Sequence, residues 1–286
     1  MVAVSAVSML IVSAAAAQAH GFVGDRFFPP TIQTDDPFAV DELALPTVTV
    51  SPNPGETDVG FSFSKEIFPK FAVAFSETYV NLAPAGMPSA GGFDNLSLNA
   101  KYQLWENAPH EAIFSLGADW DVGGTGAKKI GASSANVFTP TIYFGKGFGD
   151  LPDALKYAKP FALTGTLGEE LPSSADPNAL DWGFALEYSL PYLQSQVKDV
   201  GLSEPFKHLI PVVEFAFSTP QNRGGGPTTG TINPGILYEN NYFQIGAEAI
   251  IPADRNSGSR IGAVFQIQIY LDDLWPKVFG HPLLGR

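Results

Sequence analysis

The sequence contains no cysteine in 286 residues, so an exported fold here would have to be stable without disulfide bonds. Basic residues are also scarce, since 16 Lys and Arg face 29 Asp and Glu and give a net charge of −13. Nucleic-acid binding depends on clustered Lys and Arg, so we expect no nucleic-acid partner. Charged residues make up only 16% of the chain while hydrophobic residues make up 45%. Soluble domains are roughly a quarter charged, which indicates that this chain faces an apolar medium.

Long hydrophobic runs are missing after Ala19, because no later stretch approaches the roughly 18 unbroken apolar residues that a membrane-spanning helix needs. The segment Met1–Ala19 is apolar and ends in Ala17-Gln18-Ala19, the small-x-small pattern of a signal-peptidase site. We expect residues 1–19 to be a signal peptide, although they contain no Lys or Arg, and His20 to be the first mature residue. A short buried helix is the alternative, but the segment has no amphipathic stripe.

Apolar and polar residues alternate along much of the chain, which is the pattern of a strand with one apolar and one polar face. Between Leu96 and Leu104 every even position is apolar and every odd position is polar. Strands of about ten residues cross a bilayer when tilted. The alternation predicts an all-β fold, an antiparallel transmembrane β-barrel of about twelve strands. The predicted strands are residues 46–51, 58–65, 70–81, 95–105, 111–122, 137–146, 157–167, 180–192, 209–218, 230–239, 242–251 and 260–271.

The predicted connections divide into two classes, as is typical of outer-membrane barrels with long outer loops and short periplasmic turns. The long connections are rich in Gly, Ser, Pro and Asn and all fall on one side, whereas most of the others are tight. Two connections on the periplasmic side, 147–156 and 193–208, are longer than this rule. The predicted domains are residues 1–19 (signal peptide), 20–45 (N-terminal periplasmic or lumen-plug segment), 46–271 (barrel) and 272–286 (C-terminal periplasmic tail).

Aromatic residues on the apolar face gather near the predicted strand ends, where Trp and Tyr favour the membrane–water boundary. Trp120 and Trp182 lie at the outer ends, and Tyr102, Tyr192 and Phe243 lie toward the inner ends. We interpret them as two girdles. A soluble sandwich or lipocalin-like barrel remains the alternative, since periodicity cannot distinguish lipid from a second sheet.

Residues with catalytic potential are few. The histidines His20, His110, His208 and His281 fall at the termini or in periplasmic connections of the predicted topology. An outer-membrane hydrolase needs a His beside its Ser, so we expect no catalytic residue and no enzyme activity.

The sequence also contains no complete cofactor or metal motif. Residues 123–129 lack the phosphate-loop spacing, and the acids at 35, 36, 41 and 42 lack the calcium-loop spacing. An N-terminal His20 could bind copper, but no other ligand has a recognisable spacing from it. We therefore expect no metal and no cofactor.

The polar face of the strands is the remaining candidate site. In a membrane barrel its charged side chains must point inward, because Lys or Arg at mid-bilayer costs about 2–4 kcal/mol. They either fill a narrow barrel as a hydrogen-bonded network or line a permeation path, and acids outnumber bases among them. The predicted lumen-lining residues are Lys101, Glu111, Asp119, Asp121, Glu187, Glu214, Glu248, Arg260, Gln266 and Gln268.

The chain resembles a family of proteobacterial outer-membrane proteins labelled phenol-degradation meta-pathway proteins, which are akin to hydrocarbon-uptake channels. The features that carry the resemblance are the small-residue signal end, the start His20-Gly21-Phe22, the stretch Thr34-Asp35-Asp36-Pro37-Phe38, and the succession of hairpins through Leu271. The resemblance implies transport of aromatic compounds and supplies no catalytic residue. Barrels of this class usually end on an aromatic residue, whereas this chain continues past Leu271 to Arg286.

Together these patterns predict a channel or uptake protein for a small solute, an aromatic compound or a cation, in the outer membrane of a Gram-negative cell. The expected partners are outer-membrane lipid, the solute, and the barrel-assembly machinery during biogenesis. The alternatives are a soluble exported β-protein that binds a ligand or has a structural role, and, third, an outer-membrane hydrolase.

Overall fold

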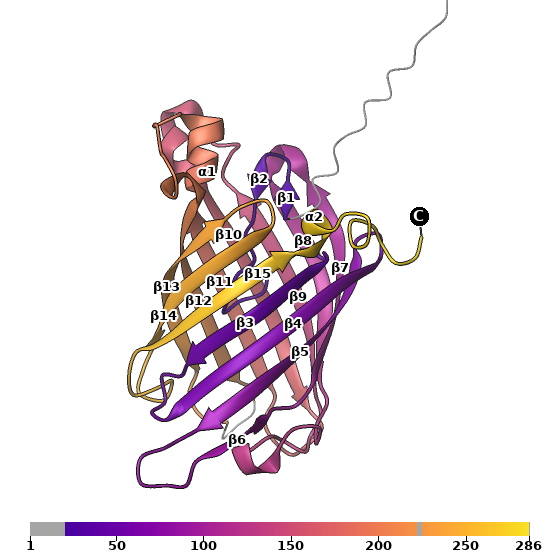
Figure 1. Cartoon of the computed structure of the whole chain (residues 1–286), viewed down its shortest axis with the longest axis vertical. Coiled ribbons are helices and arrows are strands. Elements are labelled where there is room, and N and C mark those ends of the chain that lie inside the picture. The colour runs from indigo at the N-terminus through magenta and orange to yellow at the C-terminus, as the bar shows by residue number, and fades with distance from the viewer. Residues whose placement is uncertain (1–20, 222–224, 286) are drawn as a thin grey trace, which may run out of the picture.

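The computed structural model describes residues 21–221 and 225–285, so the predicted signal peptide lies outside the described residues. Its main sheet is antiparallel and closes into a barrel, because the last strand pairs with the first strand of the ring (Figure 1). The sheet has 13 strands, of which β6 (Ala90–Phe93) pairs only with β5. The twelve strands of the ring are β3 (Glu42–Val50), β4 (Glu56–Phe68), β5 (Phe71–Leu82), β7 (Ser97–Asn107), β8 (Ala112–Asp121), β9 (Val137–Gly147), β10 (Phe161–Pro172), β11 (Ala179–Tyr188), β12 (Leu209–Pro220), β13 (Thr229–Glu239), β14 (Phe243–Pro252) and β15 (Gly262–Tyr270).

The predicted closed barrel of twelve strands is confirmed, and the strand register explains why alternation found it. Successive side chains along a strand point to opposite faces of the wall, with a period of two residues. Leu116 and Phe265 are exposed on the outer face, whereas their neighbours Ser115 and Gln266 are buried on the inner face. Outward apolar and inward polar positions therefore follow the same parity in sequence and structure.

The first barrel strand begins at Glu42, four residues before the predicted start. The pairing of β3 with β4 shifts register between Ala44 and Thr47, and an irregularity of this kind resets the parity of the residues before it. The apolar and polar alternation is interrupted there, so the sequence pattern underestimates the strand.

The strand β11 ends at Tyr188, earlier than the predicted end at residue 192. The next residue, Ser189, accepts a hydrogen bond on Oγ from the backbone N–H of Tyr192 at 3.1 Å and starts the short helix α1 (Leu190–Tyr192). Tyr192 is buried in this helix. The prediction that Tyr192 belongs to the lipid-facing girdle is therefore wrong.

The two ends of the barrel differ. We call the end that carries both ends of the described chain the terminal end, and the opposite end the loop end (Figure 1). Three connections at the terminal end are short turns, whereas those between β9 and β10 and between β11 and β12 are long, as expected for 147–156 and 193–208. In outer-membrane barrels the short turns are periplasmic. Helical turns in the connections are η1 (Ala108–His110), η2 (Lys128–Ile130), η3 (Asp153–Ala158), η4 (Leu193–Val197) and η5 (Phe206–His208), and α2 (Leu271–Leu274) follows the last strand.

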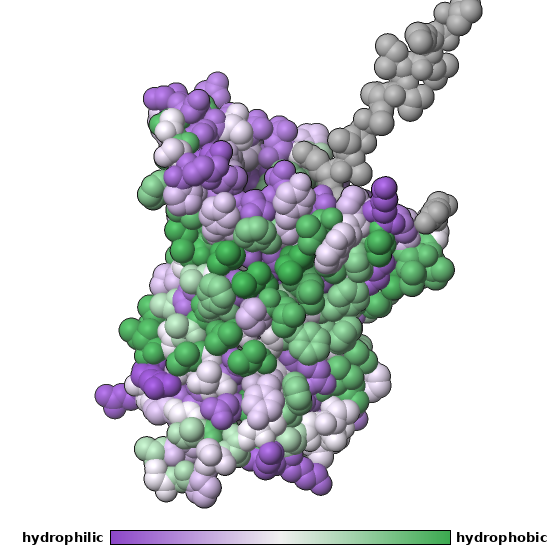
Figure 2. Space-filling model, viewed as in Figure 1, coloured by the Kyte–Doolittle hydropathy of each residue, from purple (hydrophilic) through white to green (hydrophobic). Residues whose placement is uncertain are grey.

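The outer wall carries a band of apolar side chains around its middle (Figure 2). Trp120 is exposed at the loop end of this band, and Tyr102 and Trp105 are exposed toward the terminal end. Among the described residues, no helix is long and apolar enough to cross a membrane. The strands present the apolar surface instead, as the alternation predicted.

Candidate functional site in the barrel lumen

The predicted lumen-lining side chains mostly lie inside the barrel. Asp119 and Asp121 are half-buried, and Asp119 accepts a hydrogen bond from Asn99 Nδ2 at 2.8 Å. Arg260 differs from the prediction, because β15 begins only at Gly262. Arg260 is exposed at the loop end, where its Nε donates to the carbonyl oxygen of Ser51 at 3.3 Å. The predicted residues that are buried are Lys101, Glu111, Glu187, Glu214, Glu248, Gln266 and Gln268.

The burial of these side chains is caused largely by residues 21–41, which we call the N-terminal segment. It begins with the hairpin β1 (Phe22–Val23) and β2 (Arg26–Phe27), which has the barrel strands on both sides in Figure 1. The segment contacts inward side chains from both halves of the ring before β3 begins at Glu42. Single hydrogen bonds attach it to the wall at Pro30, through Gln244, and at Ala39, through Gln103, and three larger groups of contacts hold it as well.

The first attachment is Arg26, whose side chain is completely buried. Its guanidinium donates to Glu111 Oε2 at 3.2 Å and to the carbonyl oxygens of Lys159 and Pro160 at 2.5 and 3.1 Å. The same group lies 3.7 Å from the ring centre of Tyr192, close enough for a cation–π interaction. A planar cation with several fixed donors suits this site better than Lys would.

Tyr192 also orients the acid that Arg26 contacts. Its hydroxyl donates to Glu111 Oε1 at 2.7 Å, and the backbone N–H of Gly149 donates to Glu111 Oε2 at 3.0 Å. Burial, followed by the contact with Glu111, raises the pKa of Tyr192 well above its ordinary value. Tyr192 therefore keeps its proton and remains a donor at any physiological pH.

The second attachment is Glu214, a fully buried carboxylate on β12. It accepts the backbone N–H groups of Ile32, Gln33 and Thr34 at 2.6, 3.0 and 2.6 Å, and the hydroxyl of Thr34 at 2.7 Å. A carboxylate that accepts four donors is well compensated for burial. It thereby fixes the turn of the N-terminal segment in the lumen.

The third attachment is Lys101 on β7. Its Nζ lies 2.8 Å from Asp35 Oδ2, donates to the carbonyl oxygen of Asp36 at 2.6 Å, and lies 4.5 Å from the ring centre of Tyr143. On β8, Ser115 Oγ donates to the carbonyl oxygen of Pro37. The segment is thus held across the lumen between β7–β8 and β12.

Several buried acceptors of the lumen have no hydrogen-bond partner within the described protein. Both carboxylate oxygens of Glu187 and of Glu248 belong to this group, as does Gln266 Oε1. Every atom of the group is an oxygen, and the group includes the hydroxyl of Thr164. Such a wall offers hydrogen-bonding sites to water and to polar solutes.

Three cavities lie along the barrel. The loop-end cavity measures about 750 Å³, and it shares Ser76 and Ser97 with a middle cavity of about 210 Å³. The middle cavity reaches Asp119, Lys101 and Asp35 of the N-terminal segment. The two cavities are therefore adjacent, and the ion pair between Lys101 and Asp35 lines the inner one.

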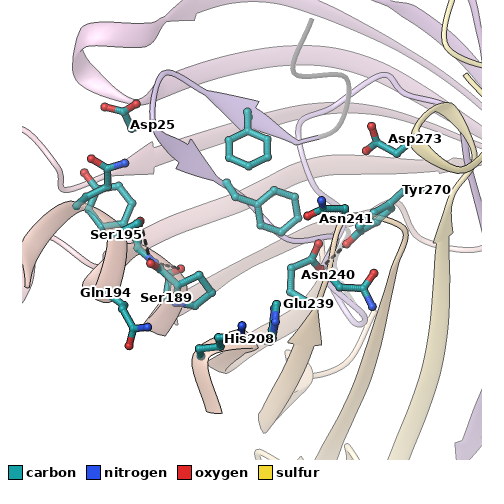
Figure 3. A pocket seen from close by; sticks show the side chains of 16 residues that line it. Asp25, Ser189, Gln194, Ser195, His208, Glu239, Asn240, Asn241, Tyr270 and Asp273 are labelled. Atoms are coloured by element: carbon teal, nitrogen blue, oxygen red, sulfur yellow. Dashed lines mark hydrogen bonds between the residues drawn. The ribbon is translucent and has the colours of Figure 1, made fainter. Parts of the chain in front are cut away.

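The third cavity, of about 630 Å³, lies at the terminal end (Figure 3). Phe22 and Phe27 of the N-terminal hairpin line it together with Tyr270, whose hydroxyl donates to Glu239 Oε2 at 2.6 Å. His208 and Asn240 also line this cavity. The N-terminal segment therefore lies between an acidic cavity at the loop end and a terminal-end cavity that aromatic and amide side chains help to line.

Some important residues of this lumen are absent from the predicted lining. Arg26 lies in a stretch without periodicity, so its role as an anchor had no pattern to reveal it. Asp58 and Asp94 line the loop-end cavity but were not selected. Asp58 could have been found, because it opens a predicted strand, whereas Asp94 lies in a connection.

Within residues 21–221 and 225–285, no group of three or more His, Asp or Glu residues is placed to hold a metal ion. The described histidines lie at the terminal end, where His110 contacts Asp150 at 3.0 Å and His208 contacts Glu204 at 3.3 Å.

Solved structures with a similar fold include outer-membrane channels. The KdgM porin has a TM-score of 0.51 at 9% identity, over 80% of this chain and 98% of its own. An outer membrane channel from Pseudomonas putida has a TM-score of 0.51 at 11% identity, over 85% of this chain and 99% of its own. The NanC porin has a TM-score of 0.50 at 7% identity, over 81% of this chain and 98% of its own.

Identities this low establish the fold alone. No family model matches the chain, and no curated protein sequence matches it. The twelve-stranded barrel with its apolar outer band is an outer-membrane β-barrel, and the soluble alternative is set aside.

Proposed function

We propose that this protein is an outer-membrane channel for small solutes, with a lumen that the N-terminal segment restricts. The observation that carries the proposal is the pair of adjacent cavities, at the loop end and in the middle of the barrel, which share Ser76 and Ser97 and reach inward to Lys101 and Asp35. A barrel filled only by packed side chains would have no such entrance.

The entrance favours cations. The described residues that line the loop-end cavity include four acids and neither Lys nor Arg. Acidic side chains within a low-dielectric wall concentrate cations and repel anions. The four acids are Glu56, Asp58, Asp94 and Asp121.

Aromatic compounds are the second solute class that we propose, as the family resemblance implies. The support within the molecule is the terminal-end cavity, where Phe22, Phe27 and Tyr270 form a cluster of rings. Rings offset or tilted at such distances interact favourably with a further ring. This surface is reached only after the segment.

Hydrolysis is the weaker alternative. The described histidines lie at the terminal end, away from the outer leaflet in which an outer-membrane hydrolase meets its substrate. The structure thus offers no described Ser–His pair at the loop end for nucleophilic catalysis.

Planar bilayer recordings test the channel directly. We expect discrete conductance steps and a reversal potential that reports cation preference under a potassium chloride gradient. The preference should be greatest in dilute salt, because the Debye length shortens to roughly 8 Å at physiological ionic strength. Purified, heat-modifiable protein that never conducts, with or without the N-terminal segment, would contradict the proposal.

A further inference from the structure

The end of β4 has an open edge that the chain fills from its own C-terminus. β3 begins at Glu42, which pairs with Ser64, whereas β4 continues to Phe68. The residues of β4 beyond Ser64 therefore have no β3 partner. The backbone N–H groups of Leu283 and Leu284 donate there to the carbonyl oxygens of Glu66 and Ile67, at 3.0 and 2.8 Å.

Further contacts hold residues 275–285, which we call the C-terminal tail, against the barrel. Lys65 Nζ donates to the carbonyl oxygen of His281 at 2.9 Å and to Asp41 Oδ2 at 2.5 Å. The ring of Phe279 packs against Phe63 with centroids 6.3 Å apart. Because Phe63 belongs to the outward parity of β4, the tail lies at the outside of the wall.

The tail exposes large apolar side chains although its backbone is fixed. Trp275, Val278 and Leu283 are 53, 62 and 64% exposed. In Figure 2 this hydrophobic surface continues into the apolar band of the barrel. Its end lies beside Phe68 and Pro69, at the same barrel end as the exposed aromatic residues Tyr102 and Trp105.

We propose that the C-terminal tail is an interfacial anchor that inserts Trp275, Val278, Leu283 and Leu284 into the inner-leaflet boundary of the outer membrane. The partner is phospholipid at the boundary between headgroups and acyl chains, where Trp and exposed aliphatic side chains are stabilised. Continuity with the apolar band selects lipid over a protein partner. Lys277, which is exposed in the same turn, faces the headgroup region.

Spin labels test this placement, and the absence of cysteine makes each introduced thiol unique. Full-length Val278→Cys and Leu284→Cys proteins would each carry a nitroxide in phosphatidylcholine vesicles. Collision with oxygen, which concentrates in lipid, is compared with collision with a water-soluble nickel complex. Leu116→Cys on the lipid-facing wall and Ala85→Cys in an exposed loop serve as references.

Labels at 278 and 284 should give an oxygen-to-nickel ratio between the two references. Lys277→Cys should give a lower ratio than Val278→Cys, because residue 277 faces the headgroup region. Ratios at 278 and 284 equal to that of Ala85→Cys would overturn the proposal, as would labels that move freely in vesicles. All these positions are exposed, so the substitutions preserve folding, which heat-modifiable migration checks for each variant.

Discussion

Lys101 holds Asp35 by a 2.8 Å ion pair in the middle of the lumen, and the same Nζ donates to the carbonyl oxygen of Asp36. One barrel side chain thus binds two consecutive residues of the N-terminal segment. Lys101 is buried, whereas the Asp35 side chain is 51% exposed, so solvent screens part of the attraction.

Replacing Lys101 with Met should loosen the segment while the barrel stays closed. The substitution removes a charge-assisted hydrogen bond and an ion pair, which together contribute about 1–3 kcal/mol to local stability. We expect faster hydrogen exchange of the backbone around residues 32–38 and more frequent opening in bilayer recordings. Asn99→Ala, on the same wall, is the matched control. Exchange equal to wild type would contradict the role of Lys101.

Removing residues 22–38 should raise single-channel conductance, because the segment separates the middle cavity from the terminal-end cavity. The deletion spares Asp41, which accepts hydrogen bonds from Lys65 and Glu66 at the start of the barrel wall. Planar bilayer recordings of the deletion and of wild type measure the effect. Equal conductance in a deletion that still migrates as a folded barrel would argue against restriction by the segment.

Substitution of Arg26 should destabilise the protein more than its position in an N-terminal segment suggests. Arg26→Met leaves Glu111 buried without its cation, and such a loss from a buried pair costs about 3–5 kcal/mol. Arg26→Lys should recover only part of this lost stability, since one ammonium cannot reach Glu111 and two carbonyl oxygens together. Thermal unfolding in detergent compares the three proteins. A fully restored midpoint in Arg26→Lys would show that charge alone matters.

Cation preference should depend on the loop-end acids. In a double variant that combines Asp58→Asn and Asp121→Asn, two of the four carboxylates that line the loop-end cavity are replaced by neutral amides. The reversal potential should then move toward zero, with the largest change in dilute salt. Neutralising Asp153, an exposed acid at the terminal end, should have little effect. Anion preference in the wild type would refute the proposed lining.

The two faces of the wall should respond oppositely to charge. Leu116→Arg puts a cation into lipid and should cost about 2–4 kcal/mol or block assembly. Asn99→Arg faces the lumen beside Asp119 and should be tolerated. Folding into phospholipid vesicles, followed by heat-modifiable migration, measures both. Equal folding of the two variants would mean that the faces are assigned wrongly.

Strand positions were predictable because lipid on one side and a polar lumen on the other impose a strict period of two. Where that period breaks, the prediction failed for a local reason. The register shift after Ala44 shortened the first predicted strand, and the Ser189 cap turned Tyr192 away from the wall. Both are local structural features that the alternation of apolar and polar residues does not indicate.

The lumen was predictable only in part. Parity identified Glu187, Glu214 and Glu248 as inward, and all three are buried. The partners of Glu214 are backbone N–H groups about 180 residues away in sequence, and backbone donors leave no signature in residue types. The path of the N-terminal segment is set by such contacts, so it could be suspected but not traced.

The attachments of the N-terminal segment follow one another in chain order: Arg26, then residues 32–34, then Asp35 and Asp36. A pulling force applied at the N-terminus from the terminal end would load them one at a time rather than together. Each attachment would bear the whole load until it broke, as in peeling rather than shearing. A modest force sustained over a few nanometres could therefore extract the segment without disturbing the hydrogen-bonded ring of strands.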